Sequence, residues 1–399
     1  MFIKFLHFDI HKYLSTVSFV LLIFSALFFA TDSYTYAQQT LNHNLWISGR
    51  GGYKSYRIPS LIVAPNGDLL AFAEGRKSPG DSGNIDLLLK RSKNNGKTWS
   101  STQIVWNNGD NTCGNPTAVV DKETGRIWLF MTWNYGEDTE SQIIQKKSKY
   151  TRRVYVCYSD NNGKTWSKPK DITSSCKKPS WGWYATGPGI GIQVQHGKYK
   201  GRLLIPANHS FSKPGGKMFG HYVYADNIIY SDDHGKTWHL SHSLNDYLNE
   251  NQLVELSDGT IMLNARNYNG KHCRAVSLSK DGGISWSKVT FDYQLVGPTC
   301  QASILNYGNY DGKDMLVFAN PAVPISRTHM TVKVSFNQGK SWSNSKLIYA
   351  GPSAYSCLTK LPNGNIGLLF ESGTTSQNQN IKFISFPPEE IFTPGSLIK

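Results

Sequence analysis

Residues 159–166 read SDNNGKTW, and the same eight-residue pattern, Ser-x-Asp/Asn-x-Gly-x-Thr/Ser-Trp, occurs five times along the 399-residue chain. The other four copies are SKNNGKTW (92–99), SDDHGKTW (231–238), SKDGGISW (279–286) and SFNQGKSW (335–342). These copies, which we call boxes, start 67, 72, 48 and 56 residues apart. A motif repeated at this kind of spacing is typical of proteins built from similar structural units.

The composition of a box predicts a tight turn between two β-strands. Asp and Asn side chains hydrogen-bond the backbone two residues on, and Gly adopts a positive φ without steric cost. The Trp that follows supplies a large apolar anchor for the next strand. Short apolar stretches lie between the boxes, at 61–64, 127–131, 203–206, 260–263, 315–318 and 366–370. Short strands between turn signals, with almost no helical periodicity, predict an all-β chain.

The repeat length favours one all-β architecture over another. A four-stranded blade takes roughly 40–60 residues in propeller folds, so the chain would form about six blades. We therefore expect a six-bladed β-propeller with the boxes in its hairpins. The alternative, a pair of β-sandwiches, predicts no hairpin pattern that recurs throughout the chain.

The N-terminus resembles a targeting segment. Lys4 and Lys12 precede an apolar run at 13–30, and Thr35-Tyr36-Ala37 is a suitable cleavage site for a signal peptide. We expect residues 1–37 to be a signal peptide and 38–399 to be one domain, secreted, periplasmic or on the cell surface. The apolar run is nearly as long as a membrane span, so a retained anchor is the alternative.

Charge and cysteine content narrow the possible partners. The formal net charge is +14, which favours anionic partners. The basic residues are evenly spread and form no run with interleaved aromatic residues, which argues against nucleic acid and for acidic glycans. The six cysteines lack the spacing of a metal site, and both disulfides and buried free thiols stay open.

The stretch Tyr56-Arg57-Ile58-Pro59 lies ahead of the first strand-like segment. Together with the ordered boxes, it makes residues 45–383 resemble the bacterial-type exo-α-sialidases (neuraminidases) of glycoside hydrolase family 33. The resemblance implies a six-bladed Asp-box propeller. It also implies a monomeric enzyme that removes terminal sialic acids from glycoproteins, glycolipids and oligosaccharides without a metal or cofactor.

The resemblance assigns three arginines to the carboxylate of sialic acid. Arg57, Arg266 in LNAR and Arg327 in ISR match the family's arginine triad in order. A rigid bidentate guanidinium suits a carboxylate, and three crowded cations need a carboxylate of their own nearby. Glu371, at the end of the strand-like LLFE, matches the residue that braces the first arginine.

The resemblance also assigns the catalytic groups. Tyr355 matches the tyrosine nucleophile, which, being neutral, avoids repulsion by the substrate carboxylate. Its base is Glu250 or Glu255, which strand alternation places on opposite faces, and the family pattern selects Glu250. Asp81, in a Gly- and Pro-rich loop, matches the acid/base aspartate, for which we expect a raised pKa.

Further substrate contacts are expected at the sugar's 4-hydroxyl and at the leaving group. Arg76 matches an arginine on the 4-hydroxyl side. Asn115 stands where several relatives carry Asp, so it can hydrogen-bond there but brings no charge. The stretch 181–191 (WGWYATGPGIG) resembles a pocket-lining segment, with Tyr184 or Thr186 expected on the leaving-group side.

Other functions remain compatible with some of these features. A trans-sialidase, or an intramolecular one that uses the sugar's own 7-hydroxyl, would share every assigned residue. A non-catalytic sialic-acid-binding propeller would need no Tyr355, Glu250 and Asp81 together. A purely structural propeller would need no arginine triad.

Overall fold

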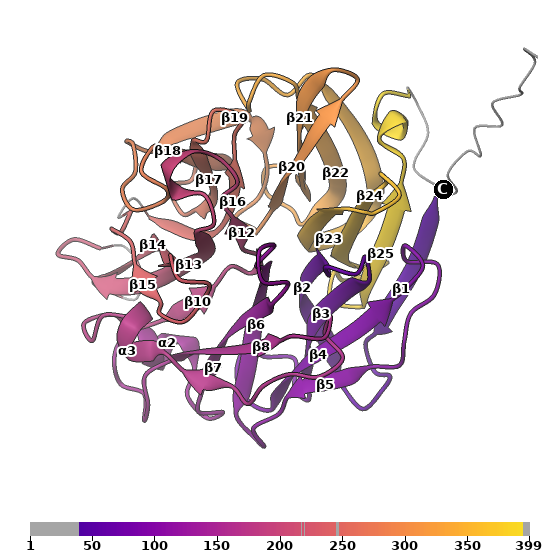
Figure 1. Cartoon of the computed structure of the whole chain (residues 1–399). Helices are drawn as coiled ribbons and strands as arrows, with labels where there is room; N and C mark the ends of the chain where they lie inside the picture. The colour runs from indigo at the N-terminus through magenta and orange to yellow at the C-terminus, as the bar shows by residue number, and fades with distance from the viewer. Residues whose placement is uncertain (1–39, 217, 219, 245–246, 394–399) are drawn as a thin grey trace, which may run out of the picture. The chain divides into compact units, whose positions relative to one another are not determined.

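The computed structural model describes residues 40–216, 218, 220–244 and 247–393. The predicted leader at 1–37 lies outside these residues. Within the described part, helices are confined to short segments such as α2 (Glu140–Ile144) and α3 (Thr173–Cys176), with 3-10 turns η1 (Gly197–Tyr199) and η2 (Pro388–Ile391). None of these described helices has the length and apolar character needed to cross a membrane. The prediction of an all-β chain is confirmed (Figure 1).

The described strands form sheets of nine, five, four and seven strands, within which most strands fall into antiparallel groups of four in sequence order. One parallel pair, Ile85 with Thr112, links the first two groups. The first group is β2 (Ser55–Val63), β3 (Leu69–Arg76), β4 (Ile85–Ser92) and β5 (Gln103–Trp106), and the second is β6 (Thr112–Val120), β7 (Ile127–Asn134), β8 (Arg153–Ser159) and β9 (Lys170–Asp171). The third is β10 (Tyr184–Thr186), β13 (Leu203–Ser212), β14 (Tyr222–Ser231) and β15 (His239–Leu240), and the fourth is β16 (Leu248–Glu255), β17 (Ile261–Asn267), β18 (Cys273–Ser279) and β19 (Thr290–Val296). Two short strands, β11 (Gly189–Ile190) and β12 (Ile192–Gln193), pair with β6 and β13.

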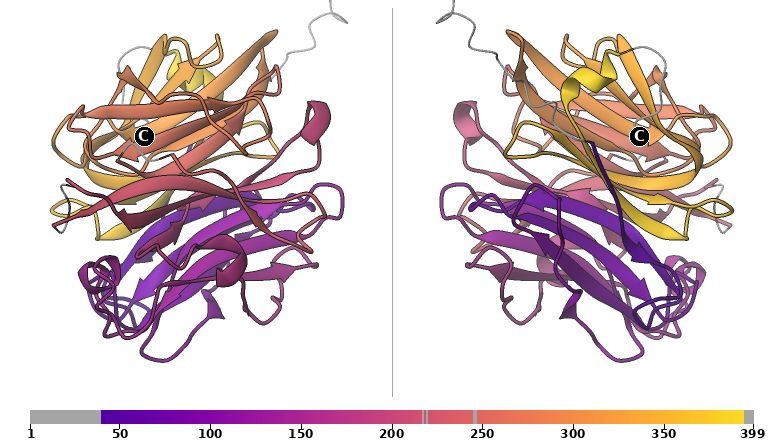
Figure 2. Two further views of the ribbon diagram at one scale, coloured as in Figure 1. Left: turned by 90° about the vertical axis from the view of Figure 1, so that its left-hand side faces the viewer. Right: turned by 90° about the vertical axis from the view of Figure 1, so that its right-hand side faces the viewer.

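The last two groups share one long strand. The fifth group is β20 (Ser303–Tyr310), β21 (Lys313–Pro321), β22 (Thr328–Ser335) and the first half of β23 (Asn344–Lys360). The second half of β23 begins the sixth group, followed by β24 (Ile366–Ser372), β25 (Asn380–Phe386) and β1 (Leu41–Ile47). The first strand of the described chain therefore completes the sheet of its last strands, and indigo β1 lies beside yellow β25 in Figures 1 and 2.

The boxes follow the third strand of each of the first five groups. Their Ser residues end β4, β8, β14, β18 and β22. The outer strand of the sixth group is β1, which comes from the other end of the chain and needs no turn after β25. This arrangement explains why six groups carry five boxes.

Each box is closed by the same local hydrogen bonds. The Ser Oγ accepts from the Gly N–H at 2.8–2.9 Å. The Asp or Asn Oδ1 accepts from the following Thr or Ser N–H at 2.9 Å. In the second box both Asn162 and Gly163 have a positive φ, of 59° and 74°. The predicted turn is confirmed, with one more left-handed residue than expected.

The core lies between neighbouring groups. One cluster joins Phe72 of β3 to Leu129 of β7, and the box residue Trp166 packs edge-on against Phe72 at a centroid distance of 5.7 Å. The box Trp thus anchors its own group to the preceding one. All six cysteines are buried free thiols.

Candidate active site

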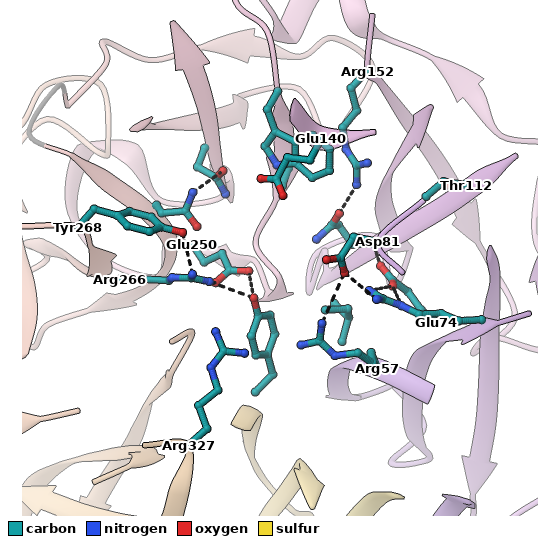
Figure 3. Close-up of a pocket in the computed structure, with 18 residues that line it drawn as sticks. Arg57, Glu74, Asp81, Thr112, Glu140, Arg152, Glu250, Arg266, Tyr268 and Arg327 are labelled. Atoms are coloured by element: carbon teal, nitrogen blue, oxygen red, sulfur yellow. Dashed lines mark hydrogen bonds and ion pairs between the residues drawn. The ribbon is translucent and has the colours of Figure 1, made fainter. Parts of the chain in front are cut away.

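A deep cavity brings together charged side chains from sequence positions 57 to 355 (Figure 3). Its lining includes five arginines and four carboxylates, namely Arg57, Arg76, Arg152, Arg266, Arg327, Glu74, Asp81, Glu140 and Glu250. Asn115 and Tyr355 also line it. Eight of the nine predicted site residues therefore meet in one cavity, and Glu371 contacts Arg57 from just beneath it.

Tyr355 and Glu250 form the centre of the site. The Tyr355 hydroxyl donates a short hydrogen bond to Glu250 Oε1. Arg266 Nη1 donates to Glu250 Oε2 at 2.7 Å and to the Tyr355 hydroxyl oxygen at 3.2 Å. Burial and the charge of Glu250 raise the pKa of Tyr355 well above its usual value, against the opposing effect of Arg266, Arg57 and Arg327. The phenol therefore holds its proton at rest, and Glu250 is placed to accept it.

Irregular strand pairing aims both of these side chains into the cavity. The β23–β24 register shifts between Ser353 and Ser356, around Tyr355, and the β16–β17 register shifts between Leu248 and Asn251, around Glu250. Such irregularities re-aim side chains next to active sites. Glu255, the other candidate base, instead accepts from the backbone N–H groups of two neighbouring residues, Gln195 at 2.7 Å and His196 at 2.8 Å.

Glu371 braces the first arginine. Its fully buried carboxylate accepts from Arg57 Nε at 3.0 Å, from Arg57 Nη2 at 3.2 Å and from the Ile58 N–H at 3.0 Å. A bidentate ion pair with an additional backbone donor is the geometry that compensates a buried carboxylate. Arg57 Nη1 remains free to face the cavity, where it lies 3.5 Å from Asp81 Oδ1.

The three triad arginines surround the Tyr355 ring. The Cζ atoms of Arg57 and Arg327 lie 4.9 and 5.7 Å from the ring centroid, and Arg266 contacts the hydroxyl. Arg327 Nη2 is oriented by the Thr299 carbonyl at 3.1 Å. Three guanidinium groups around one phenol offer the planar, bidentate donor geometry that matches a carboxylate.

Asp81 lies in the loop between β3 and β4, at the mouth of the cavity. Its side chain is 59% exposed, and its Oδ1 accepts from Arg76 Nη1 at 2.6 Å. Burial acts to raise the pKa of Asp81, but Arg76 and Arg57 outweigh it and hold that pKa below the usual value. The expectation of a raised pKa is therefore wrong for the protein without a ligand, because Arg76 forms an ion pair with Asp81.

A continuous chain of hydrogen bonds leads from Asp81 to the far wall. Arg76 donates to Glu74 Oε2 at 2.8 Å from Nε, and Glu74 Oε1 accepts from the Asn115 N–H at 2.8 Å. Asn115 Oδ1 in turn accepts from Arg152 Nη2 at 2.5 Å. Neither Glu74 nor Arg152 was predicted from the sequence. Glu74 could have been found from its place in the same strand as Arg76, two residues away and on the same face, whereas Arg152 looks like an ordinary residue of a basic pair.

The segment 181–191 does line the cavity, but through residues other than the expected ones. Trp183 and Ala185 face the cavity. Tyr184 is fully buried in the hydrophobic core and does not line the cavity. Thr186 is also buried, and its hydroxyl donates to the Asn115 carbonyl at 2.8 Å. The assignment of Tyr184 or Thr186 is wrong because strand alternation turns both away from the cavity.

The remaining wall carries Glu140 and Tyr268, which also were not predicted from the sequence. Burial raises the pKa of Glu140, whose carboxyl accepts a short hydrogen bond from the Tyr224 hydroxyl. Tyr268 accepts from Arg266 Nη2 at 2.7 Å. Across residues 40–393, apart from the four undescribed positions, no cluster of three or more His, Cys, Asp or Glu side chains could hold a metal ion.

Groups of four strands closed by boxes, with an arginine-ringed tyrosine–glutamate pair, define an all-β box-repeat protein with a site for an anionic ligand. The BNR repeat-like domain family matches residues 67–368. The chain is 34% identical to a sialidase of Micromonospora viridifaciens, covering 83% of this chain and 52% of that protein. It is 34% identical to an exo-alpha-sialidase of Aspergillus fumigatus, covering 80% of this chain and 79% of that protein.

A solved structure agrees with these relatives. The Hadza microbial sialidase superposes with a TM-score of 0.76 at 29% identity, covering 88% of this chain and 69% of that one. The chain belongs to the bacterial-type sialidase family. It spans about half the length of the Micromonospora relative.

Proposed function

We propose that this protein is an exo-α-sialidase that hydrolyses terminal sialic acids from glycoproteins, glycolipids and oligosaccharides with retention of configuration. The observation that carries the proposal is the Tyr355–Glu250 hydrogen bond inside a ring of three arginines. Sialic acid bears a carboxylate on its anomeric carbon, C2. That carboxylate would be held by Arg57, Arg266 and Arg327, which brings C2 next to the Tyr355 hydroxyl.

In the first step, Tyr355 would replace the leaving group. Glu250 takes the phenolic proton as the Tyr355 oxygen forms a bond to C2. The bond between C2 and the glycosidic oxygen breaks, and Asp81 donates the proton that the departing oxygen requires. A neutral phenol approaches the substrate carboxylate without the repulsion that a carboxylate nucleophile would meet.

In the second step, water would release the sugar. Asp81, now ionised, takes a proton from the water as its oxygen attacks C2. The bond between C2 and Tyr355 breaks, and the phenolate recovers its proton from Glu250. Two inversions at C2 give net retention.

Asp81 must carry a proton in the first step, and substrate binding would raise its low pKa for that purpose. The substrate carboxylate brings a negative charge to Arg57, which is one of the cations that hold the Asp81 pKa down. A nearby negative charge favours the protonated form of a carboxyl group. Binding would therefore raise the Asp81 pKa and prepare its proton for transfer.

The test is Tyr355→Phe assayed on a fluorogenic aryl α-sialoside, with Tyr293→Phe as the control because Tyr293 is exposed. We expect Tyr355→Phe to lose activity by about 100-fold or more, whereas the control stays at the wild-type rate. NMR of the first product should show the α-anomer. Wild-type turnover by Tyr355→Phe, or the β-anomer as first product, contradicts the mechanism.

The same covalent intermediate would also serve transfer of the sialyl group to an acceptor sugar or to the substrate's own 7-hydroxyl. Product analysis with α2,3-, α2,6- and α2,8-linked sialosides and excess lactose separates these reactions. Free sialic acid supports hydrolysis, a sialylated lactose product supports a trans-sialidase, and a 2,7-anhydro sugar supports the intramolecular reaction. Binding without any product identifies a non-catalytic propeller.

We infer that the six strand groups are the blades of a closed six-bladed propeller. Along the series of inner strands, β2 contacts β6, β6 contacts β10, and β13 of the same third group contacts β16. Strand β16 contacts β20, β20 contacts β23, and β23 contacts β2 again. A series of neighbours that returns to its start supports a ring.

We propose that the protein acts after export, as a monomer on sialylated glycans. The support is the charged start and apolar run of residues 1–37, which lie outside the described residues. N-terminal sequencing of protein recovered from the producing cells should place the mature start at Gln38. A start at Met1 on a membrane-bound protein favours the anchor, and size-exclusion chromatography with light scattering tests the monomer.

A further inference from the structure

A second cavity lies between the second and third strand groups, apart from the active site. Its volume is about 1040 Å³, against about 180 Å³ for the active-site cavity, and the two have no described lining residue in common. Ligand pockets commonly have volumes of about 300–1,000 Å³. The outer strands β9 and β15 have two residues each, so part of the space between the two groups is left uncovered. We call this second cavity the outer groove.

The floor of the outer groove is aromatic. Trp128 of β7 and the box residue Trp238 are buried and meet edge to face at a centroid distance of 5.6 Å. Tyr158 of β8 packs edge-on against Trp128 at 5.3 Å, and Tyr230 of β14 lines the groove from the third group. Both tyrosines are half-buried. Aromatic rings supply a large apolar contact area, and the C–H face of a sugar ring is a suitable partner for them.

The rim of the outer groove is basic. Lys168, Lys170 and Lys236 are exposed, and their ammonium groups form no hydrogen bond or ion pair with any other residue that the structure describes. Among the described lining residues, Asp171 is the only carboxylate, and it already pairs with Arg153 at 3.3 Å. Unpaired cations beside an aromatic surface favour an anionic ligand.

The outer groove and the active-site cavity lie near the two ends of one strand. Arg152, directly before β8, lines the cavity, whereas Tyr158, near the end of β8, lines the groove. Six residues of extended chain, at about 3.3 Å each, separate these two positions by roughly 20 Å. A branched or densely glycosylated substrate can therefore reach both sites with two of its chains.

We propose that the outer groove binds a second sialylated glycan chain of the same substrate while the cavity holds the sialic acid that is removed. This inference rests on the proposed function, which makes sialylated glycans the anionic partner at hand. The lysine ammonium groups hold the carboxylate of the second chain, the exposed Ser174 and Ser175 hydroxyls bind its sugar hydroxyls, and the aromatic floor packs on its C–H groups. Two linked contacts raise the apparent affinity by about 10²–10⁴-fold over one contact.

The competing explanation gives the outer groove no ligand. Trp128 and Trp238 belong to the hydrophobic cluster that joins the second and third groups, and surface lysines also keep a protein soluble. In that case the lysines affect no substrate selectively, and no glycan shields them. Because the three lysines lie outside the core, changing them tests the groove and leaves the packing between the groups intact.

The first experiment compares kcat/KM on a sialylated mucin with kcat/KM on a monovalent aryl α-sialoside. We expect the double variant Lys168→Glu, Lys236→Glu to lose about tenfold or more on mucin and nothing on the aryl substrate. The matched control is Lys97→Glu, Lys288→Glu, which makes the same charge change at the corresponding positions of two other boxes. Both control lysines are exposed and line neither the groove nor the cavity. An unchanged mucin value in the groove variant, or an equal loss in the control, overturns the inference.

The second experiment locates the bound chain without turnover. The Tyr355→Phe variant is acetylated in the presence of a multiply sialylated glycopeptide, the same glycopeptide after desialylation, or chondroitin sulfate, and each lysine is followed by mass spectrometry. We expect the saturating sialylated glycopeptide to slow acetylation of Lys168, Lys170 and Lys236 by about threefold or more. Lys97 and Lys288 are internal controls and should react at their free rate.

The other outcomes identify other occupants. No protection, or equal protection by the desialylated glycopeptide, overturns the inference. Stronger protection by chondroitin sulfate assigns the groove to a sulfated glycan, and protection that rises with protein concentration without any glycan assigns it to a second copy of the chain. Each of these results leaves the sialidase proposal intact. A folded wild type that is inactive on the aryl α-sialoside instead overturns the proposed function.

Discussion

The boxes and the cavity differ in how far their hydrogen bonds reach along the chain. In every box the Ser and Asp/Asn side chains bind backbone groups four residues on, and the pattern is the same five times. In the cavity, the Arg57–Glu371 pair joins residues 314 positions apart, and Tyr355–Glu250 joins residues 105 apart. The boxes are a repeated local structure, whereas the site exists only in the assembled fold.

Because of this difference, we expect substitutions in the boxes to change the stability of the fold and substitutions in the cavity to change its activity. A box glycine contacts the preceding strand group, as Gly163 does with Leu70, so a box substitution acts on the packing between groups. A cavity substitution acts on charges that are placed for a ligand. Unfolding measurements should therefore detect the box substitutions, and kinetic measurements the cavity substitutions.

The largest expected effect is on activity, at Glu250. We expect Glu250→Gln to lower kcat/KM by about 10²–10⁴, as for loss of a general base, with little change in melting temperature. Glu255→Gln is the matched control, because Glu255 binds two backbone N–H groups instead of the cavity. That control should lose about 1–2 kcal/mol of stability and keep its kcat/KM. Equal kinetic losses in both variants would contradict the assignment.

The next effect is on stability, at a box glycine. Gly163 has φ of 74°, and a Cβ added there would lie 2.8 Å from Leu70 Cδ1. We expect Gly163→Ala to destabilise the fold by roughly 2–4 kcal/mol through backbone strain and overpacking. Gly109→Ala is the control, since Gly109 has φ of 58° but no atom within 4 Å. Urea unfolding should show the smaller loss for Gly109→Ala, and kcat/KM should stay unchanged in both variants.

A smaller effect is on the pH profile, at Arg76. Arg76 is the largest of the cationic influences that hold the Asp81 pKa down against burial. Its removal raises the Asp81 pKa, so Asp81 stays protonated to a higher pH. We expect the basic limb of the kcat/KM profile to move to higher pH in Arg76→Gln, alongside a lower maximum. Arg126→Gln loses an ion pair with Asp160 and ring contacts with Trp128 and Tyr158, none of which line the cavity, and should leave the limb in place.

The smallest expected effect is on how stability depends on pH, and it distinguishes boxes that carry Asp from boxes that carry Asn. Burial acts to raise the pKa of Asp233, but hydrogen bonds from Thr237 lower it to about 2. A depressed folded pKa stabilises the fold above the unfolded value, near 3.9, and that contribution disappears as the pH falls toward 2. We expect Asp233→Asn to lose stability at neutral pH relative to the wild type, and the difference to vanish near pH 2.

The second box offers the reverse substitution as a control. Asn161 is neutral, and its Oδ1 accepts from the Thr165 N–H as Asp233 Oδ1 accepts from the Thr237 N–H. Its amide donates to the Thr165 hydroxyl, whereas Asp233 accepts from the Thr237 hydroxyl. Asn161→Asp should therefore gain a contribution to stability that is lost between about pH 4 and 2. A thermal melt series across pH measures both variants, and parallel curves for the wild type and the two variants would contradict the account.

Much of the fold could be predicted from the sequence because its signals are local. The Asp/Asn-x-Gly turns and the following Trp were readable from eight residues, and they indicated the all-β class. The absence of a sixth box was not interpretable, since nothing near residue 386 shows that β1 returns from residues 41–47 to complete the last sheet.

The predicted site residues came from their resemblance to a family, and the structure gathers them as expected. Residues outside that pattern were missed or misplaced. Tyr184 and Thr186 were chosen in place of Trp183 because the strand face could not be fixed from one apolar stretch. The pKa of Asp81 was expected in the wrong direction because its contact with Arg76 depends on how the loop folds back.

The sequence by itself determined the strands and their turns, since hydrogen bonds within eight residues and apolar periodicity act locally. Only the tertiary structure decided that Arg152 lies in the cavity wall and donates to Asn115, and that Arg76 and Arg57 hold the pKa of Asp81 below its usual value. Each of these depends on burial and on charges brought together from distant positions, and electrostatic interactions follow distance in space rather than distance along the chain.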